Sequence, residues 1–219
     1  MFPIYDENRS KTFPFVVLTL IAVNALVFWW EFTQGFDDSI FLLYGETPAL
    51  IMHGRQLISV ITSMFIHIDI LHIFGNMLYL FIFGDNIEDR FGHAKFLLLY
   101  FIFGIVGGFT HSVTAVASGG VDQYIPAVGA SGAVAGILGA YVVFCPGARI
   151  VSIVPSFFFV RLARVPAFIF IGFWFLIQIL YSGGSESVAY MAHVGGFITG
   201  LIIAAAYRAS SREERTRWY

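Results

Sequence analysis

The segment PAVGASGAVAGILGAY, residues 126–141, places a single serine in an apolar run rich in glycine and alanine. Gly132 and Gly136 form the small-xxx-small pattern that lets two membrane helices approach closely. Ser131 lies at the start of the run, on a side of the expected helix that also carries Ala135. The pattern predicts a membrane helix that packs against another helix at short range.

A second glycine-rich segment, MAHVGGFITG at residues 191–200, embeds a histidine among small residues. Gly196 and Gly200 lie within about 60° of His193 around a helix of 3.6 residues per turn. The imidazole therefore shares its helix face with glycines. Ser131 and His193 both lie near the starts of their segments, so we expect them at the same membrane depth.

The composition indicates a chain whose solvent is mostly lipid. Of 219 residues, 58% are hydrophobic and only 12% are charged, whereas soluble domains carry about 25% charged residues. A water-soluble globule is excluded. The single cysteine, Cys145, excludes an internal disulfide, and the net charge of -2 argues against a nucleic-acid partner. We expect membrane lipid as a partner, and no cofactor or metal.

Six apolar segments predict an all-α membrane protein with a single domain over residues 1–219. The expected helices cover about 13–33, 67–84, 96–117, 127–144, 165–182 and 188–207. Residues 34–66 form a long first external connector that we expect partly in the membrane interface. Residues 150–160 are apolar but short and interrupted by Pro155, so an interfacial loop is favoured over a seventh span.

Basic residues are distributed very unequally between the two sides that six spans define. Cytoplasmic loops of membrane proteins are enriched in lysine and arginine. One side receives only Arg55, and the other receives Arg9, Lys11, Arg90, Lys95, Arg149, Arg161, Arg164, Arg208, Arg212, Arg215 and Arg217. This distribution predicts a multi-pass protein of the cell membrane with both termini in the cytoplasm and the start of segment 127–144 outside.

Polar side chains inside a membrane are costly and are therefore candidates for function. A serine hydroxyl becomes a good nucleophile when a neutral imidazole accepts its proton. Ser131 and His193 meet this requirement, and no Asp or Glu in the last three segments offers a third member. We interpret the pair as a catalytic dyad.

The second apolar segment adds candidates for binding a developing oxyanion. His72 and Asn76 are four residues apart and share one helix face. Asn76 is either an oxyanion donor or a partner in a hydrogen bond between helices. The backbone N–H of Ser131, at a helix start, is a further donor. His67 is more typical of a positioning residue near the interface.

Three other interpretations remain open at this point. The glycine faces alone are typical of helix packing. The histidines His67, His72, His111 and His193 could serve as axial ligands of a haem. A non-catalytic chaperone for membrane helices, or a small transporter, would also fit the glycine-rich faces.

Three motifs together resemble the rhomboid intramembrane serine proteases. They are H67-xxxx-H72-xxx-N76, G129-A-S131-G132 and A192-H193-xx-G196-xxx-G200, on the second, fourth and sixth apolar segments. The acidic patch GDNIEDRFG at residues 84–92 also resembles that family. The resemblance implies a six-helix bundle that cleaves a transmembrane helix of a membrane protein substrate in or near the outer half of the membrane.

The resemblance also implies residue roles. Ser131 would be the nucleophile, His193 the general base, and His72 with Asn76 the oxyanion hole. The remaining motif residues would position these groups: His67, Gly129, Gly132, Gly196 and Gly200. Two positions depart from the usual family pattern. Ile58 and Ser59 replace a Trp-Arg pair in the first external loop, and Ala135 replaces an aromatic residue that packs on the histidine.

Overall fold

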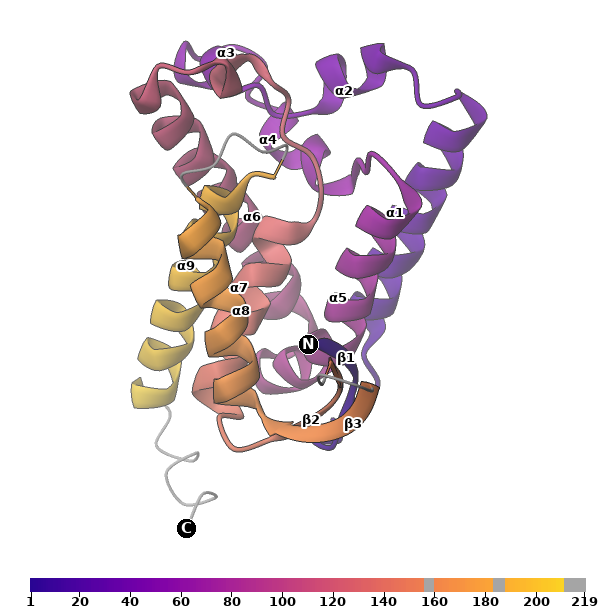
Figure 1. The fold of residues 1–219 in the computed structure, drawn as a ribbon, viewed down its shortest axis with the longest axis vertical. Coiled ribbons are helices and arrows are strands. Elements are labelled where there is room, and N and C mark those ends of the chain that lie inside the picture. Colours follow the sequence, from indigo (N-terminus) through magenta and orange to yellow (C-terminus); the bar gives the residue numbers. More distant parts are fainter. Residues whose placement is uncertain (156–159, 183–187, 211–219) are drawn as a thin grey trace.

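The computed structural model describes residues 1–155, 160–182 and 188–210. It is a mostly helical bundle, as predicted, with short helices at one end and a small sheet at the other (Figure 1). The longer helices are α1 Phe15–Thr33, α5 Ile70–Phe91, α6 His93–Ser118, α7 Ser131–Phe144, α8 Ala167–Tyr181 and α9 Tyr190–Ser210. The shorter ones are α2 Asp38–Tyr44, α3 Pro48–Met52, α4 Ser59–Thr62, and the 3-10 helices η1 Ser63–Phe65 and η2 Val121–Tyr124.

Four of these helices, α1, α5, α6 and α9, are long and apolar enough to cross a membrane. The other two apolar helices are shorter, with 14 residues in α7 and 15 in α8. At 1.5 Å per residue α7 is about 21 Å long, against about 30 Å for the hydrocarbon core. Most of α7 is buried by its neighbours. The chain is therefore a multi-pass membrane protein with α7 at its centre, and the count of six spans stays a prediction.

Residues 150–160, expected as an interfacial loop, belong largely to an antiparallel sheet. Strands β2 Arg149–Pro155 and β3 Val160–Pro166 pair with each other, and β1 Phe2–Asp6 pairs with β2. Residues 156–159 of the expected loop lie outside the described residues. The apolar run holds β-branched residues that favour strands. One of its two partner strands, β1, is distant in sequence, so the local pattern gave no sign of that pairing.

Two expected helix boundaries are corrected. The helix predicted at 67–84 begins at Ile70, where the Asp69 carboxylate accepts the His72 backbone N–H at 2.8 Å, and it runs on to Phe91. His67 therefore precedes the helix. The helix predicted at 127–144 begins only at Ser131, because the preceding residues pair with the connector instead of continuing the helix.

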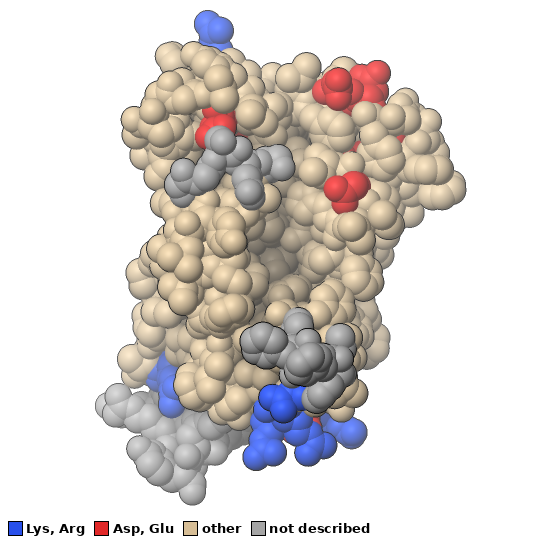
Figure 2. Space-filling model, in the orientation of Figure 1, with Lys and Arg blue, Asp and Glu red and all other residues tan. Residues whose placement is uncertain are grey.

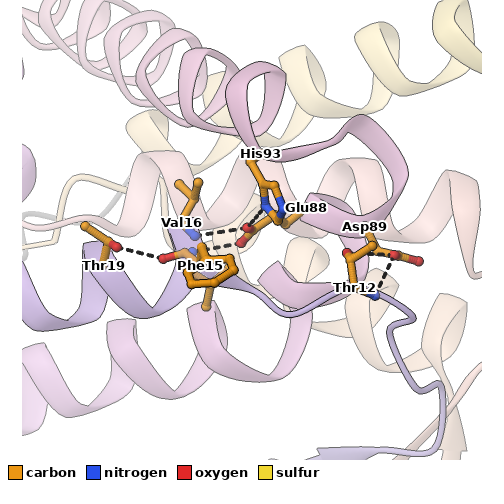
Figure 3. Close-up of polar contacts among 8 residues, drawn as sticks. Thr12, Phe15, Val16, Thr19, Glu88, Asp89 and His93 are labelled. Carbon is orange, nitrogen blue, oxygen red and sulfur yellow. Dashed lines mark hydrogen bonds and ion pairs between the residues drawn. The ribbon is translucent and has the colours of Figure 1, made fainter.

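The acidic patch at 84–92 forms the end of α5, where Glu88 caps the start of α1. Pro14, the N-cap residue of α1, makes no side-chain cap hydrogen bond. The buried Glu88 carboxylate accepts the backbone N–H groups of Val16 at 2.9 Å and Val17 at 2.8 Å, and contacts His93 Nδ1 at 2.5 Å (Figure 3). A negative group at a helix N-terminus is favourable. The patch therefore joins α1 to α5.

Replacing Glu88 by alanine should destabilise the fold. The change leaves two backbone N–H groups of α1 without their acceptor, and one of them, on the fully buried Val17, has no access to water. We expect Glu88→Ala to lower the free energy of unfolding in mixed micelles by about 1–3 kcal/mol. Thr12→Ala is the matched control. It removes an exposed hydroxyl that donates to Asp89 just before the start of α1, so its effect should be smaller. Equal losses in the two variants would contradict the capping role.

Candidate active site

Glycines bring the backbones of α7 and α9 into direct contact. A Cβ added at Gly196 would overlap the carbonyl oxygen of Gly132, and one added at Gly200 would overlap that of Gly136. These are the small residues that the sequence placed on the two faces. Any larger side chain at Gly196 or Gly200 would force the helices apart, because the obstructing atoms belong to the backbone.

Ser131 and His193 meet at this contact. Ser131 is the first residue of α7, and His193 lies in the first turn of α9. His193 Nε2 is 2.7 Å from Ser131 Oγ, which is hydrogen-bond distance. The histidine is only 8% exposed. The predicted proximity is therefore present in the structure, with geometry that allows the imidazole to accept the hydroxyl proton.

The opposite edge of the His193 ring contacts α8. The sequence analysis did not anticipate this contact. Gln178 Oε1 lies 2.7 Å from His193 Nδ1. The Trp174 ring, one turn earlier on α8, has its centroid 6.0 Å from the imidazole centroid, and Tyr190 approaches it edge-on at 6.2 Å. The aromatic neighbour that Ala135 does not supply thus comes from α8 and from the start of α9.

Two predicted oxyanion donors converge on the segment that leads into Ser131. Gly129 has φ +114°, which favours glycine, and a Cβ there would lie 2.6 Å from His72 Nε2 and 3.3 Å from Asn76 Nδ2. Asn76 Nδ2 is buried and, within the described part of the chain, has no hydrogen-bond partner. A buried donor without an acceptor costs free energy unless a ligand accepts its hydrogen bond.

His67 lies next to His72, just before the start of α5. Its backbone N–H donates to the buried Glu31 carboxylate on α1 at 3.1 Å. Its ring packs edge-on against His72, with centroids 5.0 Å apart. His67 is therefore held through both its backbone and its ring, and its positioning role stays a prediction.

The connector 34–66 fixes the segment before Ser131. Glu46 and Ala127 exchange two backbone hydrogen bonds of 2.9 and 2.8 Å, and Gly129 donates its N–H to the Ser63 carbonyl at 2.8 Å. The Glu46 side chain is buried, and Ser112 of α6 donates its hydroxyl to it at 2.6 Å. The sequence analysis did not single out Glu46. It joins the connector, α6 and the approach to the serine.

Two cavities lie at this end of the molecule. The larger, of about 460 Å³, is bounded by α5, α6 and α9 and includes His72, His111 and Tyr190 in its wall. The smaller, of about 30 Å³, includes Ser131 and Gly129 and has room for about one water molecule. Space for about one water molecule therefore exists beside the serine, and the larger cavity lies beside His72.

A multi-pass helical bundle whose central short helix begins with a serine, paired with a histidine on a glycine-packed helix, is the architecture of the rhomboid proteins. The Rhomboid domain model matches residues 54–210. The chain belongs to the rhomboid family.

Several curated proteins are similar to this chain. Rhomboid-like protease 3 of Toxoplasma gondii is 28% identical over 84% of the chain and 64% of its own length. RHOMBOID-like protein 12, mitochondrial, of Arabidopsis thaliana is 33% identical over 88% of the chain and 58% of its own length. Rhomboid protease GluP of Bacillus subtilis is 28% identical over 91% of the chain and 36% of its own length. The chain thus spans between about a third and two thirds of these relatives.

The buried Glu46 should make the fold sensitive to pH. Burial raises the pKa of Glu46 from 4.5 to about 7, against the opposing effect of the Ser112 hydroxyl. The folded chain therefore holds this proton where the unfolded chain releases it. The contribution of Glu46 to the free energy of unfolding is therefore largest below pH 4.5, falls between pH 4.5 and 7, and levels off above, with about 3 kcal/mol as the upper limit of the loss.

Glu46→Gln keeps an acceptor for Ser112 without a charge, so it should flatten this part of the curve and stabilise the fold at pH 7.5. Thermal unfolding in detergent at pH 5 and pH 7.5 measures the effect. Asp38→Asn, a change of an exposed carboxylate in the same connector, is the control and should keep the wild-type slope. Parallel curves for the wild type and Glu46→Gln would show that Glu46 does not carry the dependence.

Proposed function

We propose that this chain is an intramembrane serine endopeptidase that uses Ser131 and His193 as a catalytic dyad. The observation that supports it best is the 2.7 Å approach of His193 Nε2 to Ser131 Oγ inside a membrane protein of the rhomboid family. A serine that only allows two helices to pack closely does not require a histidine within hydrogen-bond distance. A serine nucleophile does, because a base must accept its hydroxyl proton.

The reaction follows from these two groups. Ser131 Oγ attacks the peptide carbonyl carbon while His193 Nε2 takes the hydroxyl proton. The tetrahedral intermediate then expels the amine, which receives the proton from His193, and an acyl ester remains on Ser131. A water molecule, activated by the same imidazole, hydrolyses the ester and restores the serine.

The oxyanion of each intermediate would be held by donors from two elements. Asn76 Nδ2 is a buried donor without a protein acceptor among the described residues, and it faces the Gly129 backbone beside Ser131. The N–H of Ser131 at the start of α7 adds the helix dipole. His72 Nε2, next to the same glycine, completes the group when it carries a proton.

We place the cut in or near the outer half of the cell membrane, with both termini in the cytoplasm. Lysine and arginine gather at the end that carries the sheet (Figure 2), although Arg212, Arg215 and Arg217 lie outside the described residues. The site lies toward the opposite end, at the start of α7. Because α7 is about 21 Å long, its first residue would lie below the outer surface when its last residue is at the inner one.

The substrate would be the transmembrane helix of a membrane protein, reaching the serine between α5 and α8. Near the sheet, Phe170 of α8 packs against Tyr79 and Phe83 of α5, with ring centroids 6.3 and 6.2 Å apart. The face drawn in Figure 2 is hollowed in its middle part, between the positions at which Figure 1 labels α8 and α5. The substrate backbone must unwind there to expose its carbonyl, so small or helix-breaking residues near the cut favour cleavage.

The haem alternative has less support, because both nitrogens of His193 are within hydrogen-bond distance of Ser131 and Gln178. A non-catalytic protein that binds membrane helices would keep the same packing but would not react with serine-directed reagents. Labelling by a fluorophosphonate therefore distinguishes the two functions.

Ser131→Ala and His193→Ala should each abolish cleavage of a single-span reporter while the protein remains folded and inserted. Fluorophosphonate labelling should disappear in Ser131→Ala, because the reactive oxygen is gone. Product masses give the position of the cut. As a control, Ser118→Ala changes a serine at the end of α6 and should leave labelling intact. Cleavage at the wild-type rate by either active-site variant would overturn the dyad.

Asn76→Ala should lower kcat by about a hundred- to a thousandfold, the cost of one oxyanion donor in related chemistry, with little change in KM. Asn24→Ala is a matched control, because Asn24 is also a buried amide on an apolar helix, and its Nδ2 donates to the Leu20 carbonyl of its own helix. Initial rates with the reporter measure both. An unchanged kcat in Asn76→Ala would assign the residue a structural role.

A further inference from the structure

Gln178 of α8 contacts the residue that would act as the base, so its role rests on the proposed function. Gln178 Oε1 lies 2.7 Å from His193 Nδ1, on the edge of the ring opposite Ser131. Both side chains are almost fully buried, with exposed fractions of 6% for Gln178 and 8% for His193. A polar side chain of an otherwise apolar helix is thus directed at the residue that would act as the base.

The orientation of the Gln178 amide is determined by its second partner. The Gln178 nitrogen Nε2 lies 3.1 Å from the Trp174 carbonyl oxygen. A carbonyl only accepts, so the NH₂ group must face Trp174 and the amide oxygen must face the imidazole. That oxygen also only accepts. His193 Nδ1 must therefore carry the hydrogen.

The hydrogen on Nδ1 determines the state of the other ring nitrogen. A neutral imidazole carries one N–H, so a protonated Nδ1 leaves Nε2 with a free lone pair. Nε2 is the atom that faces Ser131 Oγ at 2.7 Å. The opposite tautomer would place two lone pairs against each other at Gln178 and an N–H against the serine oxygen. It could not take the serine proton.

We propose that Gln178 is a positioning residue that selects the reactive tautomer of His193 and holds its ring toward Ser131. When the imidazole becomes positively charged, its Nδ1–H remains bonded to the amide oxygen, whose partial negative charge stabilises it. The carboxylate of soluble serine hydrolases has this function. A neutral amide performs it without a buried charge in the hydrocarbon region.

Trp174 strengthens the proposal from the same helix face. It lies four residues before Gln178, and its ring packs on the imidazole at 6.0 Å and on Phe197 of α9 at 6.5 Å. The Trp174 ring therefore restricts the position of the His193 imidazole, and the hydrogen bond to Gln178 fixes the rotation of that imidazole. One face of α8 supplies both contacts.

The test compares Gln178→Leu with Gln178→Glu in the full chain, using the single-span reporter in proteoliposomes. Leucine removes the acceptor, so kcat should fall at least about tenfold, with KM within about twofold. The roughly 10⁴-fold cost of a wrong histidine tautomer in a serine-protease triad is the upper limit. Glutamate offers an acceptor in either protonation state, so Gln178→Glu should recover most of the lost kcat. Leu180→Ala, on the exposed side of α8, is the control and should leave both constants unchanged.

A second readout does not depend on activity. ¹⁵N NMR of protein with labelled histidine distinguishes protonated from bare ring nitrogens, and His193→Ala identifies the His193 signals. We expect protonated Nδ1 in the wild type and in Gln178→Glu, and a mixture of tautomers in Gln178→Leu. If Gln178→Leu does not fold, Gln178→Met, which is closer in length, replaces it.

Unchanged kcat or an unchanged tautomer in the acceptor-free variant would overturn the role of Gln178. So would a loss of kcat that Gln178→Glu does not recover. These outcomes are separate from failure of the proposed function, which would appear as wild-type protein that neither cleaves the reporter nor is labelled at Ser131.

Discussion

Backbone contact between α7 and α9 is the constraint on which the site depends. The carbonyl oxygens of Gly132 and Gly136 occupy the space that side chains at Gly196 and Gly200 would need. The hydrophobic effect does not drive helix association within lipid, so van der Waals contacts between closely packed small residues hold the helices together. The same contact sets the distance between Ser131 and His193. A displacement of α9 by the width of one methyl group would break their hydrogen bond.

Buried carboxylates hold the remaining parts of the site in place. Glu31 binds the backbone before α5, Glu46 binds α6, and Glu88 binds the start of α1. Each joins segments that are distant in sequence, and each has a hydrogen-bond donor, as a buried carboxylate requires. The position of His72 and Asn76 relative to Gly129 is therefore set by the connector and α1 as well as by α5 itself.

Much of the fold and the core of the site could be predicted because their signals are local. Glycine spacing predicted the α7–α9 contact, and Ser131 with His193 followed from it. The pairing of β1 with β2 could not be predicted, because β2 begins at Arg149, far along the sequence from Phe2–Asp6. The second helix was expected to end at about residue 84, before the acidic patch, because the partner of Glu88 lies on α1 and leaves no local signal. Gln178 could have been identified from the sequence, because it is a polar residue within an apolar helix. It was missed because only carboxylates were considered as a third member of the site.

Under the proposed function, the contacts of α8 limit how a substrate can reach the serine. On the route proposed between α5 and α8, an intact helix about 10 Å wide would have to push α8 outward. That movement would withdraw Trp174 and Gln178 from His193 at the moment when the base must be oriented. An unwound, extended segment is narrower and can reach Ser131 while α8 stays against α9. Unwinding of the substrate would thus serve two purposes in the proposed reaction, because it would expose the scissile carbonyl and leave the histidine in its reactive tautomer.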